Sequence, residues 1–340
     1  LGGFLLLILL VVIGSMGKEK VEIPRGSYLV FDLSANITDA PPLIDLGSFS
    51  RGRVDVLQLR QATAALRQAA NDSRIKGVLI IGSVQAEGLG SGYAALAEVR
   101  RALLDFRQSG KPVHAFLTHA STRDYYLASV AEDIALDPFG MLMMPGLASE
   151  PMFFANAFEK YGVGVQVTRV GKYKSAVEPY IRDDLSPENR LQLQQLLDDI
   201  WGNLLKDIGA TRGLDVASMQ KVVDEEGMIR AEQAKTAGLV DRVIYRDEIL
   251  NELQEKTGRD GAKPFTQIAL RDYVNLINTS GTGRAGRIAV VYAEGTIVDG
   301  EGELEQIGGD RFSRELRKLR HDDSVRAIVL RVNSPGGSAS

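Results

Sequence analysis

Apolar residues follow two alternating patterns along this chain. Short runs rich in β-branched and aromatic residues alternate with longer segments in which apolar residues return every three or four positions. These are the periods of strands and amphipathic helices, so the pattern predicts an α/β fold with a largely parallel sheet. The predicted strands are Tyr28–Leu33, Gly77–Ile81, Val113–Leu117, Asp133–Leu136 and Val163–Val170. The predicted helices are Val54–Ala70, Tyr93–Ser109, Asp124–Val130, Phe153–Tyr161, a long one from Ser186-Pro187 to about Leu205, and one within Arg230–Val243, ending before a short strand.

The end of the sequence repeats an earlier stretch. Ala65–Ile80 and Glu315–Leu330 align without a gap, and the strands beginning near Gly26 and Gly286 also correspond. The identical pairs in the aligned stretches are Leu66/Leu316, Arg67/Arg317 and Asp72/Asp322. Two strand–helix–strand units in the same order predict a tandem duplicated domain. The first copy needs about 220 residues and the second stops after about 55, so we expect a fragment cut at both ends.

The chain begins with an uncharged apolar segment. As a helix through Met16 it would span about 24 Å, short of the roughly 30 Å hydrocarbon core of a bilayer. Residues upstream of Leu1 would supply the difference. A cleaved signal peptide is the competing interpretation, but no convincing small-x-small cleavage site follows. We therefore expect a transmembrane anchor at residues 1–16.

Composition narrows the function classes. A chain of 340 residues with 44% hydrophobic content can bury a large core and is long enough for two domains. A net charge of −4 argues against nucleic-acid binding. The absence of cysteine excludes disulfides, Cys-ligated zinc and a thiol nucleophile. No cofactor or metal is expected.

A histidine-based catalytic triad is poorly supported. His114 lies inside an apolar strand, His119 at the end of that strand, and His321 at a helix end, where a cation suits the helix dipole. These positions favour structural roles. No G-x-S-x-G nucleophile motif is present.

Lys174 is a candidate general base. It lies in the stretch Arg169–Pro179, which follows a predicted strand, and functional sites of α/β proteins collect at strand ends. A lysine can accept a proton only when its pKa is brought below about 10.4, by burial or by nearby cations such as Arg169 and Lys172 here. A solvated surface lysine is the more common outcome for such a stretch, so spacing alone leaves both interpretations open.

A second candidate lies at the end of the chain. The apolar strand Ala327–Val332 breaks at Asn333-Ser334-Pro335 into Gly336 and Gly337. Consecutive glycines expose backbone N–H groups, which can hold a developing oxyanion or a phosphate. An ordinary strand-ending turn would have the same sequence.

Together these stretches resemble the signal peptide peptidase A family in its long, duplicated bacterial form. The matching motifs are GKYKSAVEPY at Gly171–Tyr180, RDDLSP at Arg182–Pro187 and RVNSPGGS at Arg331–Ser338. The apolar N-terminus, the duplication and the motifs agree in order, so the resemblance covers essentially the whole chain. It implies a Clp-protease/crotonase-like fold of repeated β-β-α units. It also implies a membrane-anchored serine endopeptidase with a Ser/Lys dyad that degrades cleaved signal peptides and other hydrophobic peptides.

The resemblance also assigns residues. It places the general base on Lys174 and the oxyanion loop on Gly336 and Gly337. The family's nucleophile belongs to an A-A-S-G-G-Y-type motif of the second copy, expected about thirty residues past Ser340 from the repeat offset. This chain is therefore expected to be inactive alone. In the first copy Thr122 stands in the serine's place, so that half is not expected to attack a peptide.

The implied organisation has four parts. They are the anchor at residues 1–16, a first peptidase-like domain at 26–250 with the lysine base, a linker at 251–286, and the start of a second peptidase-like domain at 287–340. The implied location is the bacterial inner membrane, with a single span and the catalytic domains on the periplasmic side. The implied partners are peptide substrates, the membrane and further copies in a tetramer-like ring, without nucleic acid.

Two other functions are compatible with parts of the sequence. A crotonase-type acyl-CoA enzyme shares the superfamily fold and the backbone oxyanion donors. The apolar N-terminus, the Y-K-S-A context of Lys174 and the lack of a basic patch for the CoA phosphates count against it. A non-catalytic membrane scaffold, in which the duplication serves assembly, is the other alternative.

Overall fold

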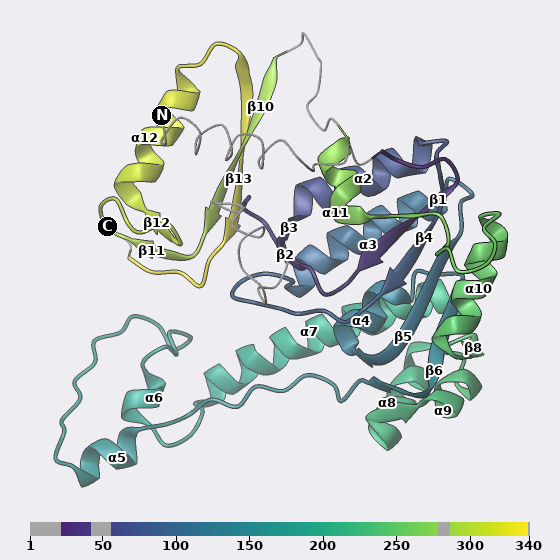
Figure 1. Ribbon diagram of the computed structural model, residues 1–340. Coiled ribbons are helices and arrows are strands. Elements are labelled where there is room, and N and C mark those ends of the chain that lie inside the picture. The colour runs from purple at the N-terminus through teal and green to yellow at the C-terminus, as the bar shows by residue number, and fades with distance from the viewer. Residues whose placement is uncertain (1–21, 42–55, 278–285, 339–340) are drawn as a thin grey trace, which may run out of the picture.

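The computed structural model describes residues 22–41, 56–277 and 286–338 (Figure 1). The expected anchor at residues 1–16 lies outside these ranges. Within them, no helix combines the length and apolar character needed to cross a membrane.

A seven-stranded sheet forms the centre of the first unit. Five strands run parallel in the order β6-β5-β4-β1-β9, β8 pairs parallel with β6, and β7 pairs antiparallel with β6. The strands are β1 (Ser27–Asp32), β4 (Ile75–Ile81), β5 (Val113–Ser121), β6 (Asp133–Met143), β7 (Met228–Arg230), β8 (Arg242–Val243) and β9 (Gln267–Ala269). The predicted α/β class with a largely parallel sheet is confirmed.

Helices cover both faces of this sheet, which explains why its strands are continuous apolar runs. In β4, Val78 and Ile80 point into the larger core, whereas Leu79 points into a smaller one on the opposite face. The smaller core is closed by Ile249 and Leu253 of α10 (Arg246–Lys256). The helices that pack on the larger core are α2 (Leu59–Asn71), α3 (Tyr93–Arg107), α4 (Thr122–Ala128), α7 (Pro187–Arg212), α8 (Val216–Glu226), α9 (Ala231–Thr236) and α11 (Leu270–Leu276).

Two predicted elements differ in the structure. The helix expected from Val54 begins at Leu59, because residues 56–58 form β3 (Val56–Gln58), which pairs with β2 (Asn36–Thr38). The strand expected at 163–170 is absent. Val163, Val165 and Val170 are exposed, and the range pairs with no described strand, so period-2 apolar alternation alone was not enough to make a strand there.

The range expected to link the two copies, residues 251–286, has structure of its own. It contains most of α10, and β9 extends the central sheet by pairing with β1. Tyr273 and Val274 of α11 are buried in the larger core. At least as far as Ile277, this range therefore packs as part of the first unit.

The second unit repeats the connectivity of the first. Its strands β10 (Arg287–Glu294) and β13 (Val325–Asn333) pair in parallel, as do β11 (Thr296–Val298) and β12 (Gln306–Gly308), and α12 (Gly309–Arg320) lies between β12 and β13 along the chain. These elements correspond to β1, β4, β2, β3 and α2.

The pairing register of the two units is also the same. Ser27 pairs with Ile75 and Arg287 with Val325, and in both units the register shifts by one residue directly afterwards. Sequence repetition and three-dimensional repetition therefore coincide.

An extended segment, residues 145–200, leaves the end of β6 and returns through the first half of α7. We call it the arm. It contains α5 (Ala155–Lys160) and α6 (Glu178–Ile181) and projects away from the sheet on the same side as the second unit (Figure 1). The C-terminal half of α7 is anchored in the larger core by Leu204, Leu205 and Ile208.

A buried arginine fixes the base of the arm to the first unit. Arg100 of α3 donates to the carbonyl oxygen of Tyr126 and to Ser129 Oγ at the end of α4. Its other terminal nitrogen donates to Asp207 O and Thr211 Oγ1 of α7, both at 2.7 Å. A buried guanidinium must have its donors satisfied, so these bonds hold α3, α4 and α7 in one arrangement.

Candidate active site

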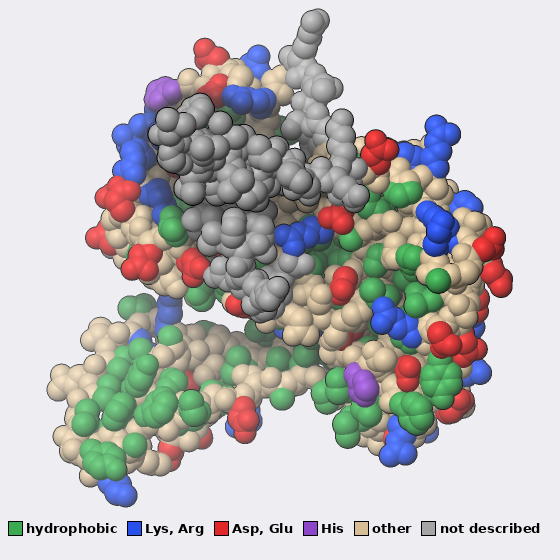
Figure 2. Space-filling model, viewed as in Figure 1, with side chains coloured by type: hydrophobic (Ala, Val, Ile, Leu, Met, Phe, Trp, Pro, Cys, Tyr) green, Lys and Arg blue, Asp and Glu red, His purple; other side chains and the backbone are tan. Residues whose placement is uncertain are grey.

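The tip of the arm is held together by aromatic rings and a tight backbone contact. Phe154, Phe158 and Tyr180 lie with ring centroids 6.3–6.4 Å apart. The Phe154 N–H donates to Pro179 O at 2.7 Å. Much of the apolar surface of the arm is exposed, and Figure 2 shows it as a concentration of hydrophobic side chains.

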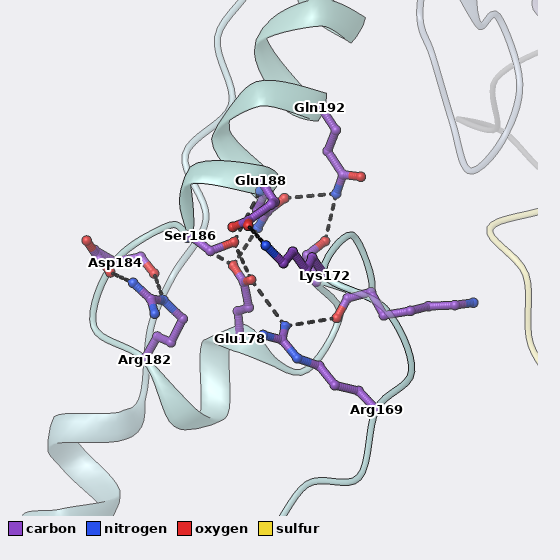
Figure 3. A network of polar contacts seen from close by, with 11 residues as sticks. Arg169, Lys172, Glu178, Arg182, Asp184, Ser186, Glu188 and Gln192 are labelled. Atoms are coloured by element: carbon purple, nitrogen blue, oxygen red, sulfur yellow. Dashed lines mark hydrogen bonds and ion pairs between the residues drawn. The ribbon is translucent and has the colours of Figure 1, made fainter.

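Glu178 is the centre of a polar network at the start of α7 (Figure 3). Its side chain is fully buried. Oε1 accepts from Ser186 Oγ at 2.5 Å and from Arg169 Nη1 at 3.4 Å. Oε2 accepts from the Ser186 N–H at 3.2 Å and from Asn189 Nδ2 at 3.0 Å. Every partner is a donor, which suits an ionised carboxylate.

Electrostatics agree with this geometry. Burial by itself would raise the pKa of the Glu178 carboxyl, but the hydrogen bonds from Ser186, Asn189 and Arg169 outweigh burial and hold that pKa below its usual range. The carboxylate also lies at the N-terminus of α7, where the helix dipole favours negative charge. Ser186 caps this helix by accepting from the Asn189 N–H, and Pro187 follows at the first helical position, as predicted from the sequence.

Lys174 lies in the loop that this network supports. Its carbonyl oxygen accepts from Arg169 Nη1 at 3.2 Å, and the next residue, Ser175, accepts at Oγ from Gln192 Nε2 of α7 at 2.9 Å. The side chain of Lys174 is exposed, and its ammonium has no hydrogen-bond or ion-pair partner among the described residues. Lys172 differs, since its Nζ lies 3.6 Å from Glu188 Oε1.

The glycine loop ends β13 in the second unit. Gly336 and Gly337 have φ values of 104° and 154°, and a Cβ on Gly337 would lie 2.0 Å from Ile297 O, so only glycine fits there. A parallel bridge to Ile297 uses the Gly336 carbonyl and the Ser338 N–H. In such a bridge the N–H of the residue between them points to the opposite side. The Gly337 N–H therefore points away from β11, and it has no hydrogen-bond partner among the described residues.

Contacts between the two units fix the strand that carries this loop. Arg331 of β13 lies 2.7 Å from Asp39 Oδ1 and 2.8 Å from Glu98 Oε1 of the first unit. Asn333 Nδ2 donates to Leu89 O at 3.3 Å. Arg331 and Asn333 belong to the second sequence motif, so that motif serves the contact between units as well as the turn.

The equivalent loop of the first unit is closed. After β4, Ser83 Oγ and the Val84 N–H donate to the two oxygens of Asp124, at 2.8 and 2.5 Å. Asp124 is fully buried and also accepts from the Ser121 N–H at 2.7 Å. Thr122, which the resemblance is expected to place where the family has its serine, is the first residue of α4 and donates from Oγ1 to Met143 O at 3.4 Å.

The structure thus places the predicted residues in separate parts of the fold. Lys174 lies on the arm and Gly336 and Gly337 in the second unit, and they share no hydrogen bond among the described residues. Sequence reasoning assigned no role to Glu178, Asp124 or Arg331. Glu178 and Arg331 stand inside the two motifs and could have been singled out there. Ser121 and Asp124 form a local capping box at the start of α4, but no local pattern shows that Asp124 also accepts from Ser83 and Val84, some forty residues away along the chain.

The other candidates carry no site. His114 is buried in β5 with Nδ1 3.1 Å from Asp133 Oδ2, the structural role that was predicted. His119 is exposed in the same strand, and His321 is the C-cap of α12. Within the ranges that the structure covers, no group of His, Asp or Glu side chains could hold a metal ion.

Comparison with known proteins defines the class. Residues 105–259 match the model of peptidase family S49. Together with relatives aligned over nearly the whole chain, this match supports a serine peptidase similar to family S49, with the ClpP/crotonase-like fold.

Three curated relatives align with nearly the whole chain. "Protease 4" of Haemophilus influenzae is 32% identical over 357 residues, covering 100% of this chain and 57% of that protein. "Protease 4" of Salmonella typhi is 34% identical, covering 95% and 54%. "Serine protease SPPA, chloroplastic" of Arabidopsis thaliana is 29% identical, covering 94% and 46%. The chain therefore spans about half the length of the curated relatives it matches.

A solved structure of a "membrane-bound stomatin-specific protease" superposes with a TM-score of 0.37 at 12% identity, over 68% of this chain and 86% of that one. A likeness this low supports no conclusion.

Proposed function

We propose that the complete protein is a membrane-anchored serine endopeptidase that cleaves apolar peptides with a Ser/Lys dyad divided between its two units. Lys174 of the arm is the general base. The nucleophile is a serine of the second unit that lies outside this sequence. The Gly336–Gly337 loop supplies the oxyanion donor. On this proposal the present chain alone is inactive.

In the proposed reaction, Lys174 accepts one proton and gives one proton back in each of the two steps, acylation and hydrolysis of the acyl ester. Neutral Lys174 Nζ takes the proton of the serine hydroxyl as Oγ bonds to the peptide carbonyl carbon. The oxyanion that forms accepts from the Gly337 N–H. When the C–N bond breaks, the Lys174 ammonium gives its proton to the leaving amine. Water then hydrolyses the acyl ester, with Lys174 again accepting and returning a proton.

One observation carries the assignment of the base. The Lys174 carbonyl accepts from Arg169 and the side chain of the next residue, Ser175, accepts from Gln192, whereas the Lys174 amine has no partner among the described residues. A general base needs a held main chain and an available nitrogen, and these bonds hold the main chain at Lys174 while its nitrogen is available. Lys172, two residues away, has its nitrogen next to a carboxylate instead.

The surface of the arm supports the substrate class. Large apolar side chains are exposed around the loop of Lys174, including Val170, which is 86% exposed, and Tyr173, which is 56% exposed. Exposed apolar surface of this kind marks a binding site for apolar segments. Cleaved signal peptides and similar apolar peptides near a membrane fit it. Residues 1–16 are the proposed membrane anchor.

The test is covalent labelling of the complete protein with a serine-directed fluorophosphonate. We expect a single labelled serine in the second unit. Lys174→Ala should lower the labelling rate by at least about a hundredfold, the usual contribution of a general base. Lys172→Ala is the matched control and should label at the wild-type rate.

Two results would contradict the proposal. Equal labelling of wild type and Lys174→Ala would remove Lys174 as the base. Absence of any labelled serine in a protein that still cleaves peptides would remove the serine mechanism as a whole.

A further inference from the structure

The carboxylate of Glu178 in the arm accepts four hydrogen bonds. It is fully buried although it lies on a four-residue helix far from the central sheet. Its four donors come from two separate segments: Arg169 before the loop of Lys174, and Ser186 and Asn189 at the N-cap and first turn of α7. The carboxylate therefore joins the start of the loop to the start of the helix.

Arg169 carries this connection to Lys174. Its Nη1 lies 3.4 Å from Glu178 Oε1 and donates to Lys174 O at 3.2 Å. A guanidinium is planar and rigid, so fixing it against one carboxylate fixes the direction of its remaining donors. At the next residue, Gln192 donates to Ser175 Oγ, and the same amide donates to Asn189 Oδ1 at 3.1 Å. The Lys174 carbonyl, through Arg169 and Glu178, and the Ser175 side chain, through Gln192, are thus both linked to the first two turns of α7.

We propose that Glu178 is a positioning residue for the peptidase reaction. Through Arg169 and the N-terminal turns of α7, it holds the loop so that the amine of Lys174 points to where the serine of the second unit lies. This inference rests on the proposed function, because it gives Glu178 a role only if Lys174 is the base.

The chemistry of the network explains why a carboxylate is needed at residue 178. All four partners donate, and an ionised carboxylate accepts at both oxygens without donating. A glutamine of the same shape would turn an NH2 group toward donors at one of the two ends. One pair of donors would lose its acceptor inside a buried site, and the loop would move to restore it.

The experiment compares Glu178→Gln with Glu188→Gln in the complete, membrane-anchored protein. Glu188 lies in the same turn of α7, but its partner is the exposed Lys172, so its loss should change kcat less than about twofold. For Glu178→Gln we expect a fall in kcat of roughly a hundredfold with little change in KM, since a displacement of about 1 Å at a catalytic group costs that much. Glu178→Asp keeps the charge and should recover part of the loss.

The labelling time course separates positioning from folding. A misplaced base slows the labelling of every molecule but leaves the final labelled fraction unchanged, so Glu178→Gln should reach the wild-type endpoint more slowly. A variant that only folds less well would lose active protein, but the remaining protein would label at the wild-type rate. If Glu178→Gln does not accumulate, Gln192→Ala provides the same test, because it removes the bond to Ser175 without altering the cap of α7.

The outcomes distinguish the two proposals. Loss of labelling in Lys174→Ala together with wild-type kcat and labelling rate in Glu178→Gln would overturn the positioning role alone. Full activity of Lys174→Ala would overturn the dyad and the positioning role with it. A hundredfold loss in both Glu178→Gln and Glu188→Gln would mean that any change at the start of α7 is damaging, which would also overturn the specific role of Glu178.

Discussion

The two strand–helix–strand units have the same connectivity and the same pairing register, but the loops that follow their second strands are used differently. In the first unit the loop donates to a buried side chain, Asp124, which fills the space in front of it. In the second unit the Gly336 N–H is taken by Ser334 Oγ, and the Gly337 N–H has no partner among the described residues. One copy has a loop closed by its own protein, and the other has a loop with a donor available to a ligand.

The units also differ in how their shared apolar pattern is buried. Leu66 of α2 is fully buried between the sheet and α3, whereas its counterpart Leu316 of α12 is partly exposed. Ile80 of β4 is fully buried, while Leu330 of β13 is 51% exposed. β4 has strands on both sides, but β13 pairs only with β10 among the described strands. The comparison teaches that a repeated sequence pattern fixes local structure, and that neighbouring elements decide what the pattern stabilises.

The largest expected difference between the copies is in core packing. Leu66→Ala should lower the free energy of unfolding by about 3 kcal/mol, because it leaves a cavity in the larger core. Leu316→Ala removes the same atoms from a partly exposed site and should cost less than about 1 kcal/mol. Urea unfolding of both variants measures the difference. Equal losses would show that the second unit is as well packed around α12 as the first is around α2.

A smaller difference is expected at the two loops. Asp124→Ala removes the acceptor of Ser83, Val84 and Ser121 and should cost about 2 kcal/mol, since water can reach part of the loop. Ser334→Ala removes the acceptor of the exposed glycine loop and should change unfolding by less than about 0.5 kcal/mol. Thermal unfolding of the two variants provides the comparison. If Asp124→Ala unfolds at the wild-type temperature, the hydrogen bonds of Asp124 do not stabilise the first loop, and this prediction is wrong.

The smallest difference concerns acid stability at the identical pair Asp72 and Asp322. The hydrogen bonds from Arg74, with help from Tyr273, outweigh burial and lower the pKa of Asp72 to about 2. A lowered pKa stabilises the fold above the ordinary value near 3.8, and this stabilisation is lost as the pH falls from about 4 to 2. After allowance for solvent screening we expect a loss of about 1 kcal/mol.

Asp72→Asn should remove this part of the pH dependence. Asp322 also has a lowered pKa, owing first to its hydrogen bonds from Ser324, but it is solvent-exposed. Asp322→Asn should therefore leave the acid profile nearly unchanged. Chemical unfolding at pH 5 and pH 2.5 measures both variants. A wild-type acid profile in Asp72→Asn would contradict the assignment.

Part of the fold and of the site was predictable because its causes are local. The order of strands and helices followed from apolar periodicity, and the start of α7 from Ser186-Pro187. The exposed segment at 163–170 was mispredicted because a strand needs a partner, and no local rule shows whether one is present. The closure of the first loop by Asp124 could not be found in advance, because its donors come from a distant part of the chain.

By itself the sequence determined the α/β class and the duplication and indicated the resemblance to a peptidase family, because periodicity, repeated residues and motif order are properties of the chain alone. It also singled out Lys174, Gly336 and Gly337 as candidates. Only the tertiary structure decided that Glu178 is buried under the cap of α7 and that Asp124 fills one of two equivalent loops. Burial and hydrogen bonding depend on which segments meet in space, and the same apolar pattern is covered in one copy and exposed in the other because their neighbours differ.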